Sequence, residues 1–180
     1  IAIGHARYST TGSSVWQNAQ PTFRPTATGS VALGHNGNLT NTHELSELLA
    51  ERTTNKPQPG NGGKSSWSSN EGATSDTGVM TSLLASYDDR SVEEAALEVL
   101  PKLRGAFSMV FMDESTLYAA RDPQGIRPLV LGRLERGWVV ASETAALDIV
   151  GASYVREIEP GEFLAIDEDG LRSERFAQAD

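Results

Sequence analysis

Apolar and polar residues alternate at every second position through much of the second half of the chain. Such a period of two is typical of strands that bury one face. Short polar stretches separate these runs at residues 113–114, 135–137 and 167–170, and they indicate successive hairpins. The pattern predicts antiparallel strands at residues 30–35, 105–112, 116–121, 128–134, 137–142, 162–167 and 171–176.

Apolar residues three and four positions apart predict helices around these strands. Leu45, Leu48 and Leu49, for example, fall on one face of a helix. Helices that flank antiparallel hairpins indicate an α+β fold built in layers. We expect these helices at residues 41–52, 76–87, 91–103 and 143–150.

Two of these helices begin with a cap pattern. Asn41 and Ser91 are each followed three residues later by a Glu, which is the spacing of a capping box. Pro101 is expected to end or bend the third helix, because it lacks a backbone N–H. Residues 55–75 are rich in Gly, Ser, Pro and Asn, and we expect a surface loop there.

The composition limits the class of protein. With 180 residues, of which 38% are hydrophobic, the chain is expected to form one domain. No apolar run is long enough to span a membrane and no signal-peptide pattern opens the chain, so a soluble, cytoplasmic protein is expected. The lack of Cys excludes disulfides and thiolate metal ligands within it. The formal net charge of -9 argues against a nucleic-acid partner, whose phosphates need a basic surface.

The charges are distributed unevenly. Residues 1–43 contain no Asp or Glu, yet they hold Arg7, Arg24 and all three histidines. A segment without carboxylates of its own can bind a substrate carboxylate without repulsion. The alternative interpretation is that this segment is simply polar.

An Asn-Gly pair, Asn36-Gly37, follows the apolar run of residues 30–33. Asn-Gly between two alternating runs usually indicates a hairpin. Here a helix start follows at Asn41 in place of a second strand. We therefore expect the pair at the C-terminal end of a strand, where the Asn amide and the backbone N–H groups are free to bind a ligand.

Four stretches resemble, in content and order, the glutaminase domain of the class II glutamine amidotransferases, which are N-terminal-nucleophile hydrolases. They are GHARYSTTG, NAQP, GHNGNLTN and TSDTG, at residues 4–12, 18–21, 34–41 and 74–78. Two further stretches are similar to the members of this family that act in purine synthesis. They are RDPQGIRPLVLG and VVASETAALDIVGASYVREIEPGE, at residues 121–132 and 139–162.

The resemblance implies an αββα four-layer sandwich, with two antiparallel sheets between helical layers, as a single domain over residues 1–180. It also implies an enzyme that hydrolyses glutamine and passes the ammonia to phosphoribosyl pyrophosphate on a phosphoribosyltransferase domain, to give phosphoribosylamine. The implied partners are glutamine, that domain and further copies of the chain in a homo-oligomer. No cofactor is implied within these residues, whereas the parent enzyme would use magnesium and, in some members, an iron-sulfur cluster.

The family's motifs assign roles to seven residues. Asn36 and Gly37 match the oxyanion hole, through the Asn amide and the Gly backbone N–H. Arg7 matches the residue that binds the glutamine α-carboxylate, a task that suits a guanidinium, and Asp76 matches the acceptor of the α-ammonium group. An Asp in the first turn of a helix is also common for structural reasons. Three more positions match the lining of the glutamine pocket: Tyr8, Thr10 and Gln20.

The chain departs from the family at the nucleophile. Family members attack the amide with an N-terminal Cys, whereas this sequence contains no Cys and starts at Ile1. We expect a fragment that lacks the nucleophile segment and the phosphoribosyltransferase domain. One rival is a non-catalytic glutamine-binding or interaction module. Another is the glucosamine-6-phosphate-forming amidotransferase, which RYSTTG and NAQP disfavour, since its stretches typically read RWATHG and NAHP.

Two other groups of residues invite a functional interpretation. His5, His35 and His43 lack the spacing and the acidic partners of a metal site, so no metal is expected. The stretch from Asp122 to Arg127 is expected to form a Pro-containing turn between two strands. Phosphate binding there is disfavoured, because no Gly-rich loop opens a helix.

Overall fold

The computed structural model describes residues 1–6, 19–54 and 75–179. Within these residues the α-helices are α1 (Thr42–Thr54), α2 (Asp76–Ala85), α3 (Val92–Val99) and α4 (Thr144–Val150), and a 3₁₀ turn follows α3 at Leu100–Lys102. The strands are β1 (Thr22–Pro25), β2 (Ser30–Leu39), β3 (Gly105–Met112), β4 (Leu117–Arg121), β5 (Val130–Leu134), β6 (Gly137–Ala141), β7 (Ser153–Glu157), β8 (Glu162–Asp167) and β9 (Gly170–Arg175).

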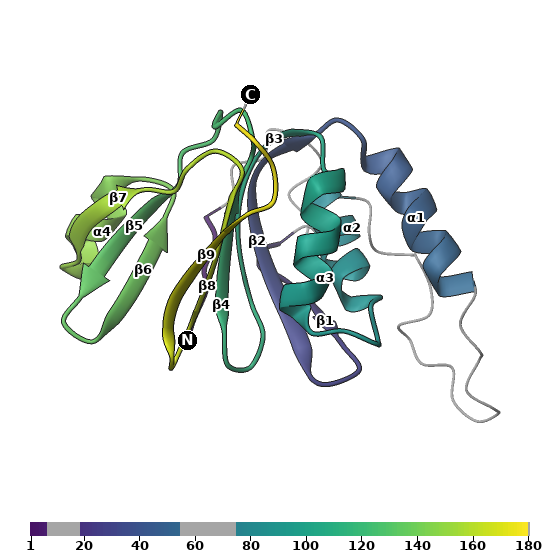
Figure 1. Ribbon diagram of the computed structural model, residues 1–180, viewed down its shortest axis with the longest axis horizontal. Coiled ribbons are helices and arrows are strands. Elements are labelled where there is room, and N and C mark those ends of the chain that lie inside the picture. The colour runs from purple at the N-terminus through teal and green to yellow at the C-terminus, as the bar shows by residue number, and fades with distance from the viewer. Residues whose placement is uncertain (7–18, 55–74, 180) are drawn as a thin grey trace.

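The strands form two antiparallel sheets. The larger has the order β1-β2-β3-β4-β8-β9, and the smaller has the order β6-β5-β7. Helices α1, α2 and α3 cover one face of the larger sheet, the smaller sheet packs on its other face, and α4 lies outermost (Figure 1). The predicted α+β sandwich of four layers, αββα, is thereby confirmed.

Each interface between layers has its own apolar cluster. The largest lies between the helices and the larger sheet, and it includes Leu83, Ala95 and Phe107. The second lies between the two sheets, where Leu131 of β5 meets Leu164 of β8. The third joins the smaller sheet to α4 through Val130, Leu147 and Ala152. Alternate residues of β5 therefore serve different clusters, as a strand buried on both faces requires.

Strand β2 is longer than the alternation predicts. The expected strand ended at residue 35, whereas β2 continues to Leu39 and pairs with β3 over its whole second half. Asn36 and Gly37 lie opposite Ser108 and Phe107. The Asn-Gly pair is thus inside the strand and near its end, because backbone pairing with β3 does not depend on alternating side chains.

Two strands were not expected, because one is very short and the other buries almost none of its side chains. Strand β1 is four residues long and ends at Pro25, and most side chains of β7 are exposed. Both are edge strands, at the rim of the larger and the smaller sheet respectively. Short, exposed or proline-containing strands are typical of sheet edges, and a strand that buries few side chains carries little hydrophobic pattern.

One helix start and one helix end follow the sequence, and the side chain at a second helix start departs from it. Ser91 and Glu94 form the predicted capping box of α3, and Pro101 lies in the 3₁₀ turn that ends it. Asn41 directly precedes α1, its carbonyl accepts from the N–H of Leu45, and its amide donates to Glu44 at 3.5 Å. Its side-chain oxygen, however, accepts from the N–H of Arg104 at 3.0 Å and not from the helix, and its amide also donates to the carbonyl of Lys102 at 2.9 Å. The side chain therefore ties α1 to the segment before β3.

No helix within the described residues is long and apolar enough to cross a membrane.

Candidate functional site

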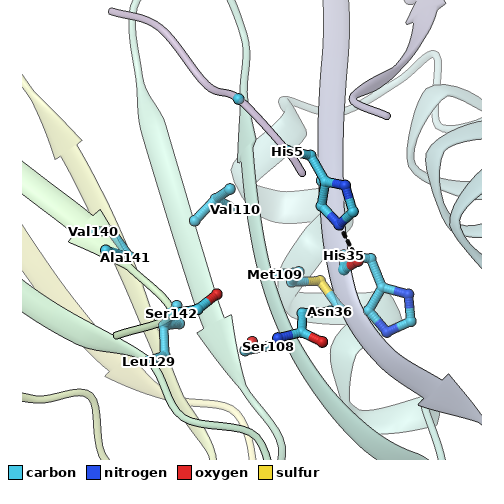
Figure 2. Close-up of a pocket in the computed structure, with 12 residues that line it drawn as sticks. His5, His35, Asn36, Ser108, Met109, Val110, Leu129, Val140, Ala141 and Ser142 are labelled. Carbon is cyan, nitrogen blue, oxygen red and sulfur yellow. Dashed lines mark hydrogen bonds between the residues drawn. The ribbon is translucent and has the colours of Figure 1, made fainter. Parts of the chain in front are cut away.

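Consecutive side chains of β2 face opposite sides of the larger sheet. Leu33 packs beneath the helices, and by the same alternation His35 faces α2 while Asn36 faces the smaller sheet. Figure 2 shows the Asn36 amide and the His35 imidazole pointing apart. The second half of β2 thus places two polar side chains, one residue apart, in two different layers.

Asn36 lines a small, open pocket between the two sheets. Ser108, directly opposite Asn36 on β3, and Ser142, just after β6, add hydroxyl groups to the same pocket (Figure 2). Within the described residues, no hydrogen-bond partner is found for the Asn36 amide. An amide at a pocket wall with unused N–H donors can bind an oxygen of a ligand.

The outer edge of β2 is covered by side chains once β1 ends. Strand β1 pairs with β2 only as far as Leu33. Beyond it, the N–H of His35 donates to Oε1 of Gln20 at 2.7 Å, and the N–H of Leu39 donates to Oδ2 of Asp76 at 3.3 Å. Two of the residues singled out in the sequence, Gln20 and Asp76, therefore flank one short piece of backbone.

The N–H of Gly37 lies between these two donors in the strand. By the two-residue period it points toward the same outer edge. On β3, the N–H of Phe107 donates to Oδ2 of Asp122 at 3.2 Å, and the Phe107 carbonyl accepts from the N–H of Asp122 at 2.8 Å. By the alternation along β2, Asn36 and Gly37 thus offer adjacent donors, one on the side chain and one on the backbone.

Gly37 has a backbone conformation that requires glycine. Its φ is +145°, which side chains of L-residues rarely allow. A Cβ at this position would collide with the carbonyl oxygen of Ala106 on β3. The strand can therefore bend close to β3 here only because residue 37 has no side chain.

Asp76 begins α2, where Ser75 caps the helix by accepting from the N–H of Gly78 at 3.2 Å. The Asp76 carboxylate accepts from the N–H of Thr77 at 2.9 Å and from that of Leu39, and it lies 3.6 Å from Nδ1 of His35. Burial raises the pKa of this carboxyl, but His35 and the two N–H donors outweigh burial and hold the pKa below its ordinary value. Asp76 is therefore an anion at neutral pH, which is what an ammonium ligand needs.

The three histidine rings do not converge on one point. Nε2 of His5 is 3.0 Å from the carbonyl oxygen of His35, and the His35 ring is buried against α2. His43 is exposed on α1 beside Glu47. Across residues 1–6, 19–54 and 75–179, no three His, Asp or Glu side chains are grouped as metal ligands.

The stretch from Asp122 to Arg127 is a tight structural turn. Asp122 is fully buried and accepts from the N–H groups of Phe107, Ile126 and Arg127, at 3.1 to 3.2 Å. The preceding Arg121 is 7% exposed, and its guanidinium donates to three backbone carbonyls and to Glu157. These partners occupy the Arg121 guanidinium, which is therefore not open to a phosphate.

Three of the predicted site residues, Arg7, Tyr8 and Thr10, lie outside the described residues. The structure adds two that the sequence reasoning missed. Ser108 is 2% exposed and was read only as part of a strand, and His35 was read only as a structural histidine. The alternation along residues 105–112 could have placed Ser108 beside Asn36 only with the strand pairing known, since register is not visible in one strand alone.

Comparison with known proteins matches residues 65–149 to the glutamine amidotransferase domain family. Nearly the whole chain, 98%, is also 60% identical to amidophosphoribosyltransferase of Mycobacterium leprae and 58% identical to that of Mycobacterium tuberculosis. The chain is a glutamine amidotransferase domain of the amidophosphoribosyltransferase type. It spans about a third of the length of these relatives, 30% and 32%.

The solved structures agree with this assignment of the amidotransferase domain. Glutamine phosphoribosylpyrophosphate amidotransferase from Bacillus subtilis, solved with ADP and GMP, superposes with a TM-score of 0.77 at 36% identity, over 96% of this chain and 34% of that one. The sandwich, its two sheets and its helical layers are therefore those of the N-terminal-nucleophile hydrolase fold.

Proposed function

We propose that the chain is the glutaminase part of an amidophosphoribosyltransferase, which releases ammonia from glutamine and delivers it to phosphoribosyl pyrophosphate. The observation that supports this best is the 60% identity to such an enzyme across 98% of the chain. The adjacent donors of Asn36 and Gly37 support the same chemistry, because amide hydrolysis passes through a tetrahedral oxyanion that needs two fixed donors.

In the proposed reaction a thiolate attacks the side-chain amide carbon of glutamine. The carbonyl oxygen becomes an oxyanion, which accepts from the Asn36 amide and the Gly37 N–H. The C–N bond then breaks and ammonia leaves with a proton, after which water hydrolyses the thioester to glutamate. The nucleophile is proposed to be an N-terminal Cys of the parent protein, which these 180 residues do not include.

Glutamine would be recognised by its two charged ends. The Arg7 guanidinium is proposed to bind the α-carboxylate, and Asp76 the α-ammonium group. Asp76 suits this role because it is ionised and partly exposed at a helix start close to Leu39, two residues past Gly37. Tyr8, Thr10 and Gln20 are proposed to line the same pocket, although Oε1 of Gln20 is already engaged with the backbone of β2.

The second half-reaction would take place on a phosphoribosyltransferase part of the parent protein. Ammonia would displace pyrophosphate from phosphoribosyl pyrophosphate to give 5-phosphoribosylamine, the first step of purine synthesis. Magnesium is proposed to act in that part of the parent protein. The parent protein is also proposed to be a homo-oligomer in the cytoplasm and, in some members, to carry an iron-sulfur cluster.

The test uses the full-length protein, with glutamate and pyrophosphate release measured as functions of glutamine and phosphoribosyl pyrophosphate. Arg7→Ala should raise KM for glutamine and change kcat little, whereas Asn36→Ala should lower kcat with little change in KM. Asn38→Ala, an exposed residue of the same strand, is the control and should behave as wild type. If glutamate were released but no pyrophosphate formed from phosphoribosyl pyrophosphate, the protein would be another class II amidotransferase. Glutamine binding without glutamate release would point to a non-catalytic module.

A further inference from the structure

The His35 side chain is almost fully buried, at 2% exposure, between β2 and the start of α2. Its Nδ1 lies 3.6 Å from Oδ2 of Asp76 and 3.5 Å from the Thr77 hydroxyl. Its Nε2 has no hydrogen-bond partner within the described part of the chain. A buried N–H without an acceptor costs more than a buried lone pair without a donor. The proton is therefore assigned to Nδ1, on the side of Asp76.

The backbone of His35 is held in place as firmly as its ring. Its N–H donates to Gln20 at 2.7 Å, and its carbonyl oxygen is 3.0 Å from Nε2 of His5. The backbone from which the His35 ring projects is therefore fixed, directly before the two donors at Asn36 and Gly37. A contact from this ring to Asp76 fixes the Asp76 carboxylate relative to those donors.

We propose that His35 is a positioning residue for glutamine, which holds the Asp76 carboxylate at the correct distance from the oxyanion donors. This inference rests on the proposed function, since it assumes that Asp76 accepts the α-ammonium group. The distance from Nδ1 to Oδ2 is longer than an ordinary hydrogen bond. Contacts of this kind often shorten when the substrate is bound. A residue such as His35 improves binding by holding the binding group, here the Asp76 carboxylate, in one position.

Two variants of equal size separate positioning from packing. His35→Asn keeps an N–H donor near the place of Nδ1, whereas His35→Leu has the same branched shape and no donor. In the full-length enzyme, His35→Leu should raise KM for glutamine roughly tenfold and leave kcat within about twofold, as expected for loss of one hydrogen bond to a charged group. His35→Asn should stay within about twofold of wild type. His43→Leu, at an exposed histidine of α1, is the matched control and should change nothing.

Two further measurements show whether His35 acts through Asp76. His35→Leu should add no further loss in an Asp76→Asn background, because residues that act as one unit are not additive. It should also leave unchanged the inhibition constant of 4-carbamoylbutanoate, which is glutamine without its α-amino group. If His35→Leu fails to fold by circular dichroism, His35→Gln moves the donor away from Nδ1 while keeping a polar side chain, and it should show the same rise in KM.

Equal weakening of glutamine and of the deaminated analogue would overturn the inference, as would equal kinetics for the Leu and Asn variants. An unchanged KM in a folded His35→Leu protein would overturn it as well, with the proposed function intact. A wild-type enzyme that releases no glutamate would instead overturn the proposed function, and the inference together with it.

Discussion

Arg156 of β7 and Glu162 of β8 form a two-pronged ion pair that joins the smaller sheet to the larger. Nη1 and Nη2 of Arg156 lie 2.8 and 2.7 Å from the two carboxylate oxygens of Glu162. Glu162 is 3% exposed and also accepts from the Ser173 hydroxyl and the N–H of Glu159. Paired geometry of this kind is stronger than a single contact and fixes the orientation of both groups.

The first prediction concerns acid stability. Burial raises the pKa of Glu162, but hydrogen bonds from Arg156, Ser173 and Glu159 outweigh it and leave the pKa below the ordinary value of 4.5. A carboxyl with a lowered folded-state pKa stabilises the fold fully above its unfolded pKa, and this stabilisation is lost as the pH falls through the folded pKa. The free energy of unfolding of wild type should therefore decrease as the pH is lowered beyond about 4.5.

Glu162→Gln should lose part of this acid dependence and be less stable than wild type at neutral pH. Urea unfolding of both proteins, at several pH values from neutral to about pH 3, measures the difference. Glu174→Gln, at an exposed position of β9, is the control and should follow wild type. Parallel pH curves for wild type and Glu162→Gln would rule out a role for this carboxylate in acid unfolding.

The second prediction concerns the turn that follows β4. Asp122→Ala leaves the buried N–H of Phe107 and the partly buried N–H groups of Ile126 and Arg127 without their acceptor. It should lower the free energy of unfolding by about 1 to 3 kcal/mol, which is the cost of one unsatisfied buried group. Chemical denaturation gives the value, and Asp169→Ala in the exposed turn before β9 should change it by less than about 0.5 kcal/mol. A stable Asp122→Ala protein would mean that water replaces the carboxylate.

The third prediction concerns the Asn36 amide. In the full-length enzyme, Asn36→Ala should lower kcat for glutamine hydrolysis by about 10²- to 10³-fold, as loss of one oxyanion donor does elsewhere. The melting temperature should hardly change, because the amide has no hydrogen-bond partner in the described part of the chain. Steady-state kinetics and thermal melts of one preparation test both halves. A variant with full turnover would remove Asn36 from the oxyanion hole.

The fourth prediction concerns Gly37. Gly37→Ala places a methyl group against the Ala106 carbonyl and forces an unfavourable φ, so both stability and turnover should fall. We expect a loss of more than about 1 kcal/mol in the free energy of unfolding, as at other positions that only glycine tolerates. Gly170→Ala tests the conformational cost alone, because that turn glycine has a positive φ and open space around it. A Gly37→Ala loss no larger than that of Gly170→Ala would show that the contact with β3 is unimportant.

Much of the fold could be predicted from the sequence, because most strands bury one face and most helices an apolar stripe. Strands β3 and β8 have the expected bounds, and the capping box at Ser91 is where the spacing placed it. Edge strands β1 and β7 could not be predicted in this way, since few of their side chains are buried. The length of β2 depends on backbone pairing with β3, which leaves no mark on its own side chains.

The candidate site could be predicted only in part. The motifs pointed to Asn36, Gly37 and Asp76, and the structure adds the contacts that tie Asp76 and Gln20 to the edge of β2. Ser108 and His35 escaped notice because their importance comes from neighbours far away in sequence. Ser108 faces Asn36 across a strand pair, and His35 meets a helix that begins some forty residues later.

The opposite orientations of His35 and Asn36 restrict how this gene can diverge. A codon inserted or deleted within β2 would exchange the two faces of the sheet from that point on. The imidazole would enter the pocket between the sheets, the amide would be buried under α2, and the bend that glycine permits would fall on a residue unable to make it. Descendants are therefore expected to vary here by replacement of single amino acids, with changes of length confined to the hairpin turns.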